Sequence, residues 1–188
     1  MSAASQNTEP LRLMLDQNFP LQPSGMRFDR LDKSVRLEHF NTAFPAYARV
    51  STPDWKMYLL AKSGGFDAVI TSDVNQLDED VEMIVLQLTK LGLITWKRGE
   101  PDTVILYGQL LAYMPQVGRE LRQMPASVVT LPTASIRRPD HVNRPGDLAR
   151  KRHRHDGKSY AERKSQTISV VRADLAGTAD EHLLDLLG

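Results

Sequence analysis

At 188 residues, the chain is long enough for one domain of ordinary size with an extension, and too short for two large cores. Its hydrophobic fraction of 41% and charged fraction of 25% are those of a globular protein, which excludes wholesale disorder. The absence of cysteine excludes disulfides, thiolate metal sites and cysteine nucleophiles. A metal ion would therefore need carboxylate or imidazole ligands.

The net charge of +1 conceals an uneven distribution along the chain. Residues 1–136 carry a net charge of −2, residues 137–172 carry +7, and residues 173–188 carry −4. This pattern predicts an acidic domain followed by a basic extension with an acidic end. No segment approaches the roughly 20 apolar residues that cross a bilayer, and residues 1–10 do not resemble a secretory leader. We therefore expect a cytoplasmic protein with no membrane partner.

Short apolar segments predict buried β-strands, and the first two end in acidic or polar residues. Residues 11–15 (LRLML) are followed directly by Asp16. Residues 66–71 (FDAVIT) are followed by Ser72 and Asp73, which repeats the same design. Two further strands are expected at residues 93–96 and 128–131.

Amphipathic spacing predicts helices between these strands, at residues 54–62, 80–90 and 102–122. Gly92 is a typical stop signal for the second helix, and Pro115 is expected to kink or split the third. Strands that alternate with helices indicate an α/β fold whose mostly parallel sheet is covered on both faces.

From about residue 137 the chain is rich in arginine and proline and contains few large apolar side chains. Such a composition predicts a disordered basic tail over residues 137–188. Within it, residues 180–187 (DEHLLDLL) could form a short helix that docks on the domain or on a partner. The expected organisation is a flexible N-terminus at residues 1–10, an α/β domain at residues 11–136, and this tail.

The predicted strand ends suggest a metal site. Ligands of open α/β sheets bind beyond the carboxyl ends of the strands, where Asp16 and Asp73 should lie. Two carboxylates at neighbouring strand ends can hold a hard cation such as Mg²⁺ or Mn²⁺, and Asp54, at the start of a helix, would add a third. Such a metal activates water and neutralises charge on a phosphate during hydrolysis. The pattern therefore predicts a nuclease.

Polar neighbours of these acids are candidates for orienting waters or phosphate oxygens, namely Asn18, Ser72 and Asn75. A simpler interpretation of the acids competes with the metal site. Asp is common where a chain caps the next helix, which would explain Asp16 and Asp73. An acid in a first helical turn stabilises the helix dipole, which would explain Asp54 without any chemistry.

Two segments also resemble a known family. LRLMLDQNFP resembles the LL-D-E-N-L-P opening of the PIN-like proteins, and FDAVITSDVNQL resembles their second signature, an apolar strand that ends in T-x-D. The resemblance covers roughly residues 11–118. It implies a three-layer α/β/α fold and metal-dependent ribonuclease activity on RNA, as in the toxins of toxin–antitoxin pairs. An antitoxin or another protein would then be a partner.

The same resemblance implies roles for individual residues. Asp16, Asp54 and Asp73 would belong to the metal site, with Asp78 as a fourth acid. Gln17 departs from the family, which has glutamate at this position. That departure supports an alternative function, a catalytically inactive PIN-like module that binds nucleic acid or a protein partner.

The densest positive run contains Arg150, Lys151, Arg152 and Arg154. Such a run can neutralise phosphates and release counterions, which predicts binding to nucleic acid; a solvated tail is the competing interpretation. Self-association into a homo-oligomer is left open. A response-regulator-like or nucleotide-binding domain would also gather aspartates at strand ends, but the sequence lacks a glycine-rich phosphate loop.

Overall fold

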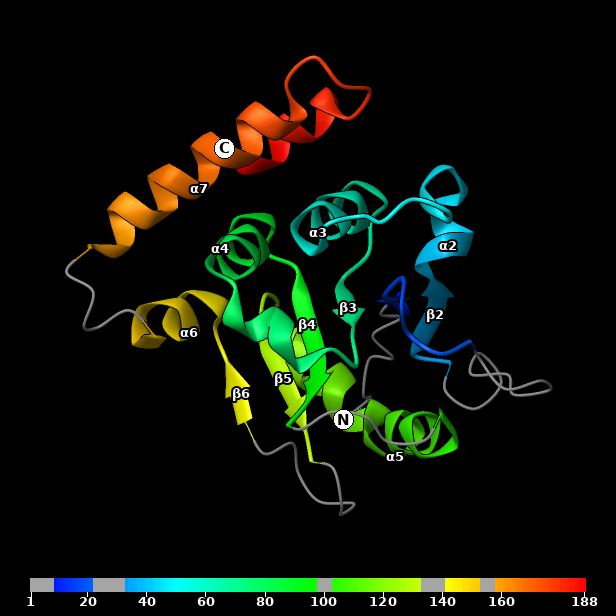
Figure 1. Cartoon of the computed structure of the whole chain (residues 1–188). Helices are drawn as coiled ribbons and strands as arrows, with labels where there is room; N and C mark the ends of the chain where they lie inside the picture. The colour runs from blue at the N-terminus through cyan, green and yellow to red at the C-terminus, as the bar shows by residue number, and fades with distance from the viewer. Residues whose placement is uncertain (1–8, 22–32, 98–102, 133–140, 153–157) are drawn as a thin grey trace, which may run out of the picture.

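The computed structural model describes residues 9–21, 33–97, 103–132, 141–152 and 158–188 (Figure 1). Its strands are β1 (Leu11–Leu15), β2 (Val35–His39), β3 (Ala68–Ile70), β4 (Gly92–Trp96), β5 (Val128–Leu131) and β6 (His141–Asn143). They form one sheet in the order β2-β1-β3-β4-β5-β6. The first five run parallel, and β6 pairs antiparallel with β5. The expected mostly parallel sheet is confirmed.

The α-helices are α2 (Phe40–Ala43), α3 (Asp54–Ser63), α4 (Asp80–Thr89), α5 (Thr103–Gln123), α6 (Pro145–Arg152) and α7 (Tyr160–Leu175). Short 3₁₀ helices are η1 (Pro45–Tyr47), η2 (Val74–Asp78) and η3 (Glu181–Leu187). Figure 1 shows α3 and α4 on one face of the sheet and α5 on the other, which makes three layers. Across the described ranges, no helix has both the length and the apolar character that a bilayer crossing requires.

Each face of the sheet packs against its own hydrophobic core. Side chains along β1 alternate between these two cores, and this alternation determines on which face Asp16 lies. Leu13 and Leu15 of β1 pack with α5, whereas Met14 packs with α3 and α4. Successive side chains of a strand point to opposite faces, so Asp16 follows Met14 onto the side of α3 and α4. By the same rule, Thr71 follows Val69 onto that side.

The end of α4 differs from the expected glycine stop. Lys90 closes the helix in the left-handed conformation, with φ of 54°. Gly92 is instead the first residue of β4, where a Cβ would lie 2.6 Å from Leu121 Cδ2. The glycine is therefore needed for close packing of α5 against the sheet.

Two other features differ from expectation. Helix α5 runs unbroken through Pro115, so the expected split is wrong. Pro115 is exposed, and the packing residues on either side of it, such as Tyr113 and Val117, hold the helix on the sheet. Strand β2 also had no clear signal in the sequence, and its pairing with β1 makes it the edge of the sheet.

The expected disordered tail over residues 137–188 is wrong for its described parts. Strand β6 extends the sheet, and α6, α7 and η3 pack against α4 (Figure 1). A few apolar residues are enough to hold this segment on the domain, because they recur at helical spacing and enter the core beside α3 and α4. These residues are Val171, Leu175, Leu183 and Leu187. The domain therefore does not end at residue 136. The terminal helix expected at residues 180–187 is confirmed as η3, docked on α3 and α4.

Candidate metal centre

The first two acids lie at the ends of neighbouring strands, as the sequence predicts. Leu15 of β1 is in register with Ile70 of β3, and the backbone N–H of Asp16 donates to Ile70 O at 2.9 Å. The Asp16 side chain is buried, with 2% of its surface exposed, whereas Asp73 is exposed. Strand pairing thus brings the two aspartates to one edge of the sheet.

Asp16 is held by hydrogen bonds from Thr71 and from the backbone N–H groups of Asn18 and Phe19. Its Oδ1 accepts the backbone N–H of Asn18 at 2.7 Å, and the Thr71 hydroxyl hydrogen-bonds to its carboxylate. Burial raises the pKa of Asp16, and these hydrogen bonds oppose the rise. Asn18 therefore acts through its backbone, and its own side chain is exposed.

Asp73 has a capping role. Its Oδ1 accepts the backbone N–H of Asn75 at 2.8 Å, which caps η2. Its own N–H donates to Thr71 Oγ1 at 3.0 Å. Thr71 therefore links the two strand ends, because its hydroxyl bonds to Asp16 and accepts from Asp73. The capping interpretation is confirmed for Asp73, whereas the bond from Asn18 to Asp16 closes a turn at residues 16–19 and caps no helix.

Two helix starts add two more carboxyl groups. Asp54 is the first residue of α3, and Glu82 lies in the first turn of α4. Their side chains hydrogen-bond to each other. Burial, together with the charges of Asp16 and Asp73, raises the pKa of Asp54 to about 6. Burial also raises the pKa of Glu82 to about 9, with the Asp54 charge as the next cause. A bond between two carboxyl groups needs a proton, so this pair shares one at neutral pH.

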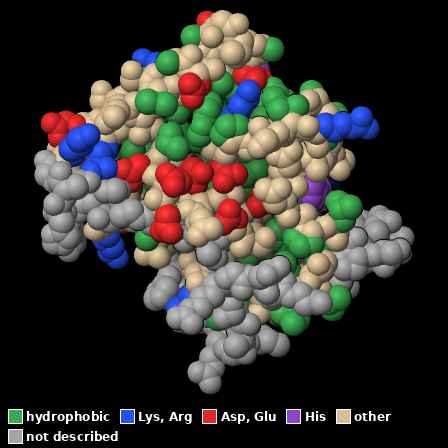
Figure 2. Space-filling model, viewed as in Figure 1, with side chains coloured by type: hydrophobic (Ala, Val, Ile, Leu, Met, Phe, Trp, Pro, Cys, Tyr) green, Lys and Arg blue, Asp and Glu red, His purple; other side chains and the backbone are tan. Residues whose placement is uncertain are grey.

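The acidic cluster is defined as Asp16, Asp54, Asp73 and Glu82, and the imidazole of His39 acts electrostatically on Asp16. No lysine or arginine of the described ranges forms an ion pair with any of its members. Glu82 is 8% exposed, and its Oε2 atom is buried without a hydrogen-bond partner. Figure 2 shows acidic side chains gathered in a band across this face of the molecule. One unsatisfied buried oxygen and an excess of negative charge favour a cation.

A buried relay orients Asp54. The Tyr58 hydroxyl donates to Gln76 Oε1 at 2.7 Å, and the Gln76 side chain hydrogen-bonds to Asp54. Because Tyr58 occupies the Gln76 oxygen, the Gln76 NH₂ group is the part left to donate to the Asp54 carboxylate. Tyr58 is fully buried, and burial raises its pKa well above the ordinary value.

The sequence did not indicate Thr71, Gln76 or Glu82 as site residues. Glu82 lies outside the apolar stripe that predicts α4, so its position appeared solvent-exposed. It is buried because packing covers more of α4 than the stripe predicts. The only available signal was its place in the acid-rich run DEDVE at residues 78–82.

The remaining predicted polar residues contribute less. Ser72 is half-buried between the strand end and Asp73, and Asn75 is exposed and engages Asp73 through its backbone. Asp78 ends η2, is exposed, and is not among the charges that shift Asp54 or Glu82. Among the residues that the structure describes, no group of three or more acidic or histidine side chains is arranged so that it could hold a metal ion.

The Gln17 side chain bonds to the loop that leads to α3. Its Nε2 donates to Val50 O at 2.8 Å and to Tyr47 O at 3.2 Å, and its Oε1 accepts from the Thr52 N–H at 3.4 Å. The amide thus ties residues 47–52 to the end of β1. A glutamate here would present a carboxylate to two carbonyl oxygens, because it has no N–H to donate.

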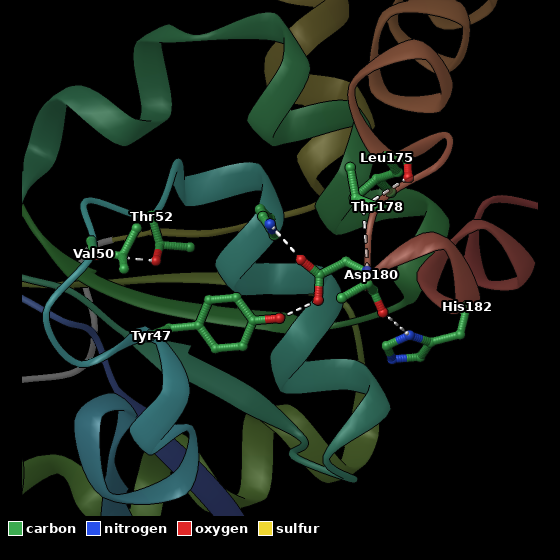
Figure 3. A network of polar contacts seen from close by, with 9 residues as sticks. Tyr47, Val50, Thr52, Leu175, Thr178, Asp180 and His182 are labelled. Carbon is green, nitrogen blue, oxygen red and sulfur yellow. Dashed lines mark hydrogen bonds and ion pairs between the residues drawn. The ribbon is translucent and has the colours of Figure 1, made fainter.

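The same loop is held from the other side by the C-terminal segment (Figure 3). Asp180 is 6% exposed, and its carboxylate accepts the Tyr47 hydroxyl and lies 2.5 Å from Lys56 Nζ. Burial and this hydrogen bond raise the pKa of Tyr47 to about 12. Burial raises the pKa of Asp180 as well, but Lys56 and Tyr47 outweigh it and the net shift is downward.

The basic run lies away from the acids. Arg150 Nη1 is 2.8 Å from Asp147 Oδ1, and its guanidinium stacks 4.7 Å from the Tyr160 ring centroid. Lys151 is exposed, Arg152 is the last residue of α6, and Arg154 lies outside the described residues. Gly146 at the start of α6 contacts Gln87 near the end of α4, a helix about 15 Å long. The acidic cluster is at the opposite end of that helix.

Comparison with known proteins does not place the chain in a family. No family model, curated protein or solved structure matches it.

Proposed function

We propose that the protein is a Mg²⁺- or Mn²⁺-dependent endoribonuclease of PIN-like type. Asp16, Asp54 and Asp73 would hold the metal, and Glu82 would join them. One observation carries this proposal: Asp54 and Glu82 hydrogen-bond to each other within electrostatic reach of Asp16 and Asp73, and Glu82 Oε2 is buried and unpartnered. The motifs at residues 11–20 and 66–77 support the PIN-like assignment.

The donor set fits such a metal, because Mg²⁺ and Mn²⁺ prefer carboxylate oxygens. A bound cation of this kind supplies water activation and charge neutralisation during phosphodiester hydrolysis. The chain's own residues prepare the site: Thr71 fixes the Asp16 carboxylate, and Gln76 fixes Asp54. Asp54 and Glu82 would release their shared proton when a cation is bound, and Glu82 Oε2 would gain a partner.

RNA is proposed as the substrate because the family resemblance implies it and because the basic run can attract phosphates. The basic run would neutralise phosphates of the strand and release their counterions. Because α6 meets α4 near the C-terminal end of α4, the strand would run from the acids along α4 to the basic run. An antitoxin and a homo-oligomer remain predictions.

A second candidate is a catalytically inactive PIN-like module that binds nucleic acid or a protein partner. The backbone N–H groups that Oδ1 of Asp16 and Oδ1 of Asp73 already accept favour this candidate. Gln17, which stands where PIN-like proteins have glutamate, is the sequence feature that suggests this candidate. Since Gln17 bonds to the loop at residues 47–52, it serves folding, and its identity does not by itself weaken the acidic cluster.

Titration with Mn²⁺ separates the two candidates. We would compare the wild type with an Asp16→Asn, Asp73→Asn double variant, and measure both the thermal midpoint and RNA cleavage. An Asp174→Asn, Asp185→Asn variant is the matched control, because it removes two exposed acids from α7 and η3. The ribonuclease proposal expects Mn²⁺ to stabilise the wild type and the control, and both to cleave RNA.

The double variant should neither respond to Mn²⁺ nor cleave. Stabilisation of the wild type by Mn²⁺ without any cleavage would favour the binding module. Equal metal response and equal cleavage in all three proteins would overturn the metal centre.

A further inference from the structure

A cavity lies at the opposite edge of the sheet from the acidic cluster. Its volume is about 400 Å³, and it is lined by the ends of α4 and α5 and the start of α6. Lys90 precedes β4, Ala126 precedes β5, and Arg144 follows the antiparallel β6, so all three lie at the amino edge of the parallel strands. A volume in this range suits a small organic ligand.

The charge of this cavity is the reverse of the charge at the acidic cluster. Lys90 and Arg144 line it, both are exposed, and no acidic side chain is among its lining residues. No carboxylate of the described ranges forms an ion pair with either cation. Two neighbouring cations without a counter-charge attract an anion, and arginine in particular binds phosphate through paired N–H donors. The start of α6 adds a favourable helix dipole.

The rest of the lining suits a planar body attached to the anion. Met124 and Pro125 supply an apolar wall, and the carboxamides of Gln87 and Gln123 supply donors and acceptors. Gln87 Oε1 accepts the Tyr160 hydroxyl, so this carboxamide is held in place. Carboxamides bind the edges of nucleobases, and flat rings pack on apolar side chains.

The backbone is strained at this cavity. Lys90 has φ of 54° and Ala126 has φ of 61°, and these are the only non-glycine residues with positive φ among the described ones. Both line the cavity. A left-handed conformation is unfavourable for lysine and alanine, and such strain concentrates at ligand sites.

We propose that this cavity binds a nucleoside monophosphate, with its phosphate between Lys90 and Arg144 and its base against Met124 and Pro125. The proposal does not depend on the ribonuclease proposal, because none of these residues belongs to the acidic cluster. It joins the charge, the shape and the backbone strain of the cavity in one explanation.

Calorimetric titration of the full chain tests this proposal. The ligands are the four ribonucleoside 5′-monophosphates, adenosine and inorganic phosphate. At least one monophosphate should bind at least about tenfold more tightly than both adenosine and phosphate, because only it uses both halves of the cavity. A Lys90→Asn, Arg144→Gln variant should lose about tenfold or more in affinity, and asparagine tolerates the left-handed backbone at position 90.

An Arg119→Gln, Lys164→Gln variant is the matched control, because it removes two exposed cations elsewhere. Its affinity should equal that of the wild type. Absence of binding by all four monophosphates overturns the proposal, as does phosphate binding as tightly as the nucleotide, or an equal loss in the control. If the Lys90→Asn, Arg144→Gln variant fails to fold, hydrogen exchange of the wild type with and without nucleotide tests the proposal instead. Bound nucleotide should slow exchange in residues 123–126 and 144–147. Unchanged exchange in these residues overturns the proposal.

Discussion

Asp180 lies close to the end of the chain, yet its Oδ2 atom is 2.5 Å from Nζ of Lys56 in α3. Lys56 follows Asp54 by two residues, so the C-terminal segment holds the helix that presents a proposed metal ligand. Tyr47, which also donates to Asp180, belongs to the loop that Gln17 ties to β1. The start of α3 is therefore fixed from two sides.

Substitution of Asp180 by alanine should destabilise the protein by about 3 kcal/mol, because removal of one partner leaves Lys56 largely buried without its counter-charge. Urea unfolding followed by circular dichroism measures the change. An Asp185→Ala variant, which removes an exposed acid of η3, should differ from the wild type by less than about 0.5 kcal/mol. Similar midpoints for the two variants would show that the Asp180 contacts contribute little.

Replacement of Gln17 by glutamate restores the residue of the PIN-like motif, but we expect it to destabilise the protein. The new carboxylate would face the carbonyls of Tyr47 and Val50 without a donor, at a cost of about 1 to 3 kcal/mol. Hydrogen exchange in residues 47–53 should accelerate in this variant, while exchange in β4 stays slow. A Gln17→Glu protein with wild-type stability and exchange would contradict the assigned role of Gln17.

The metal-free protein should lose stability as pH rises. Glu82 and Asp54 have folded pKa values above their ordinary values, so between about pH 5 and pH 9 the native state binds more protons than the unfolded chain. The stabilising contribution is complete below the ordinary pKa and is lost as pH rises through the folded pKa. Thermal midpoints in the presence of a chelator should therefore fall across this range.

A Glu82→Gln variant is the test of that assignment. Its amide can donate to Asp54 without a titratable proton, so the thermal midpoint should vary less with pH and exceed that of the wild type near pH 9. An Asp174→Asn variant, which alters an exposed acid of α7, should keep the wild-type profile. If Glu82→Gln also keeps it, the shared proton lies elsewhere.

The C-terminal segment should behave as part of the core. Leu183 is fully buried against α3 and α4, so Leu183→Ala should cost about 2 to 5 kcal/mol. Leu186→Ala, at a half-buried position, should cost less. Equal and small effects in chemical unfolding would mean that η3 is a dispensable attachment.

Local patterns were enough to predict much of this fold. The runs at residues 11–15 and 66–71 became β1 and β3, and the acids that follow them reached one edge of the sheet. Apolar periodicity and strand-end chemistry are properties of neighbouring residues, so they can be read from the chain directly. The same holds for the helices that begin at Asp54 and Asp80.

Other features of the structure depend on packing between residues that are distant in the chain. Glu82 is buried because neighbouring elements cover more of α4 than its apolar stripe predicts. Asp180 pairs with Lys56 because the C-terminal segment packs beside α3. Residues 141–188 looked too polar to fold because only a few apolar side chains, such as Leu175 and Leu187, enter the core. Burial and charge pairing depend on residues distant in the chain, so they follow from the assembled fold and not from local composition.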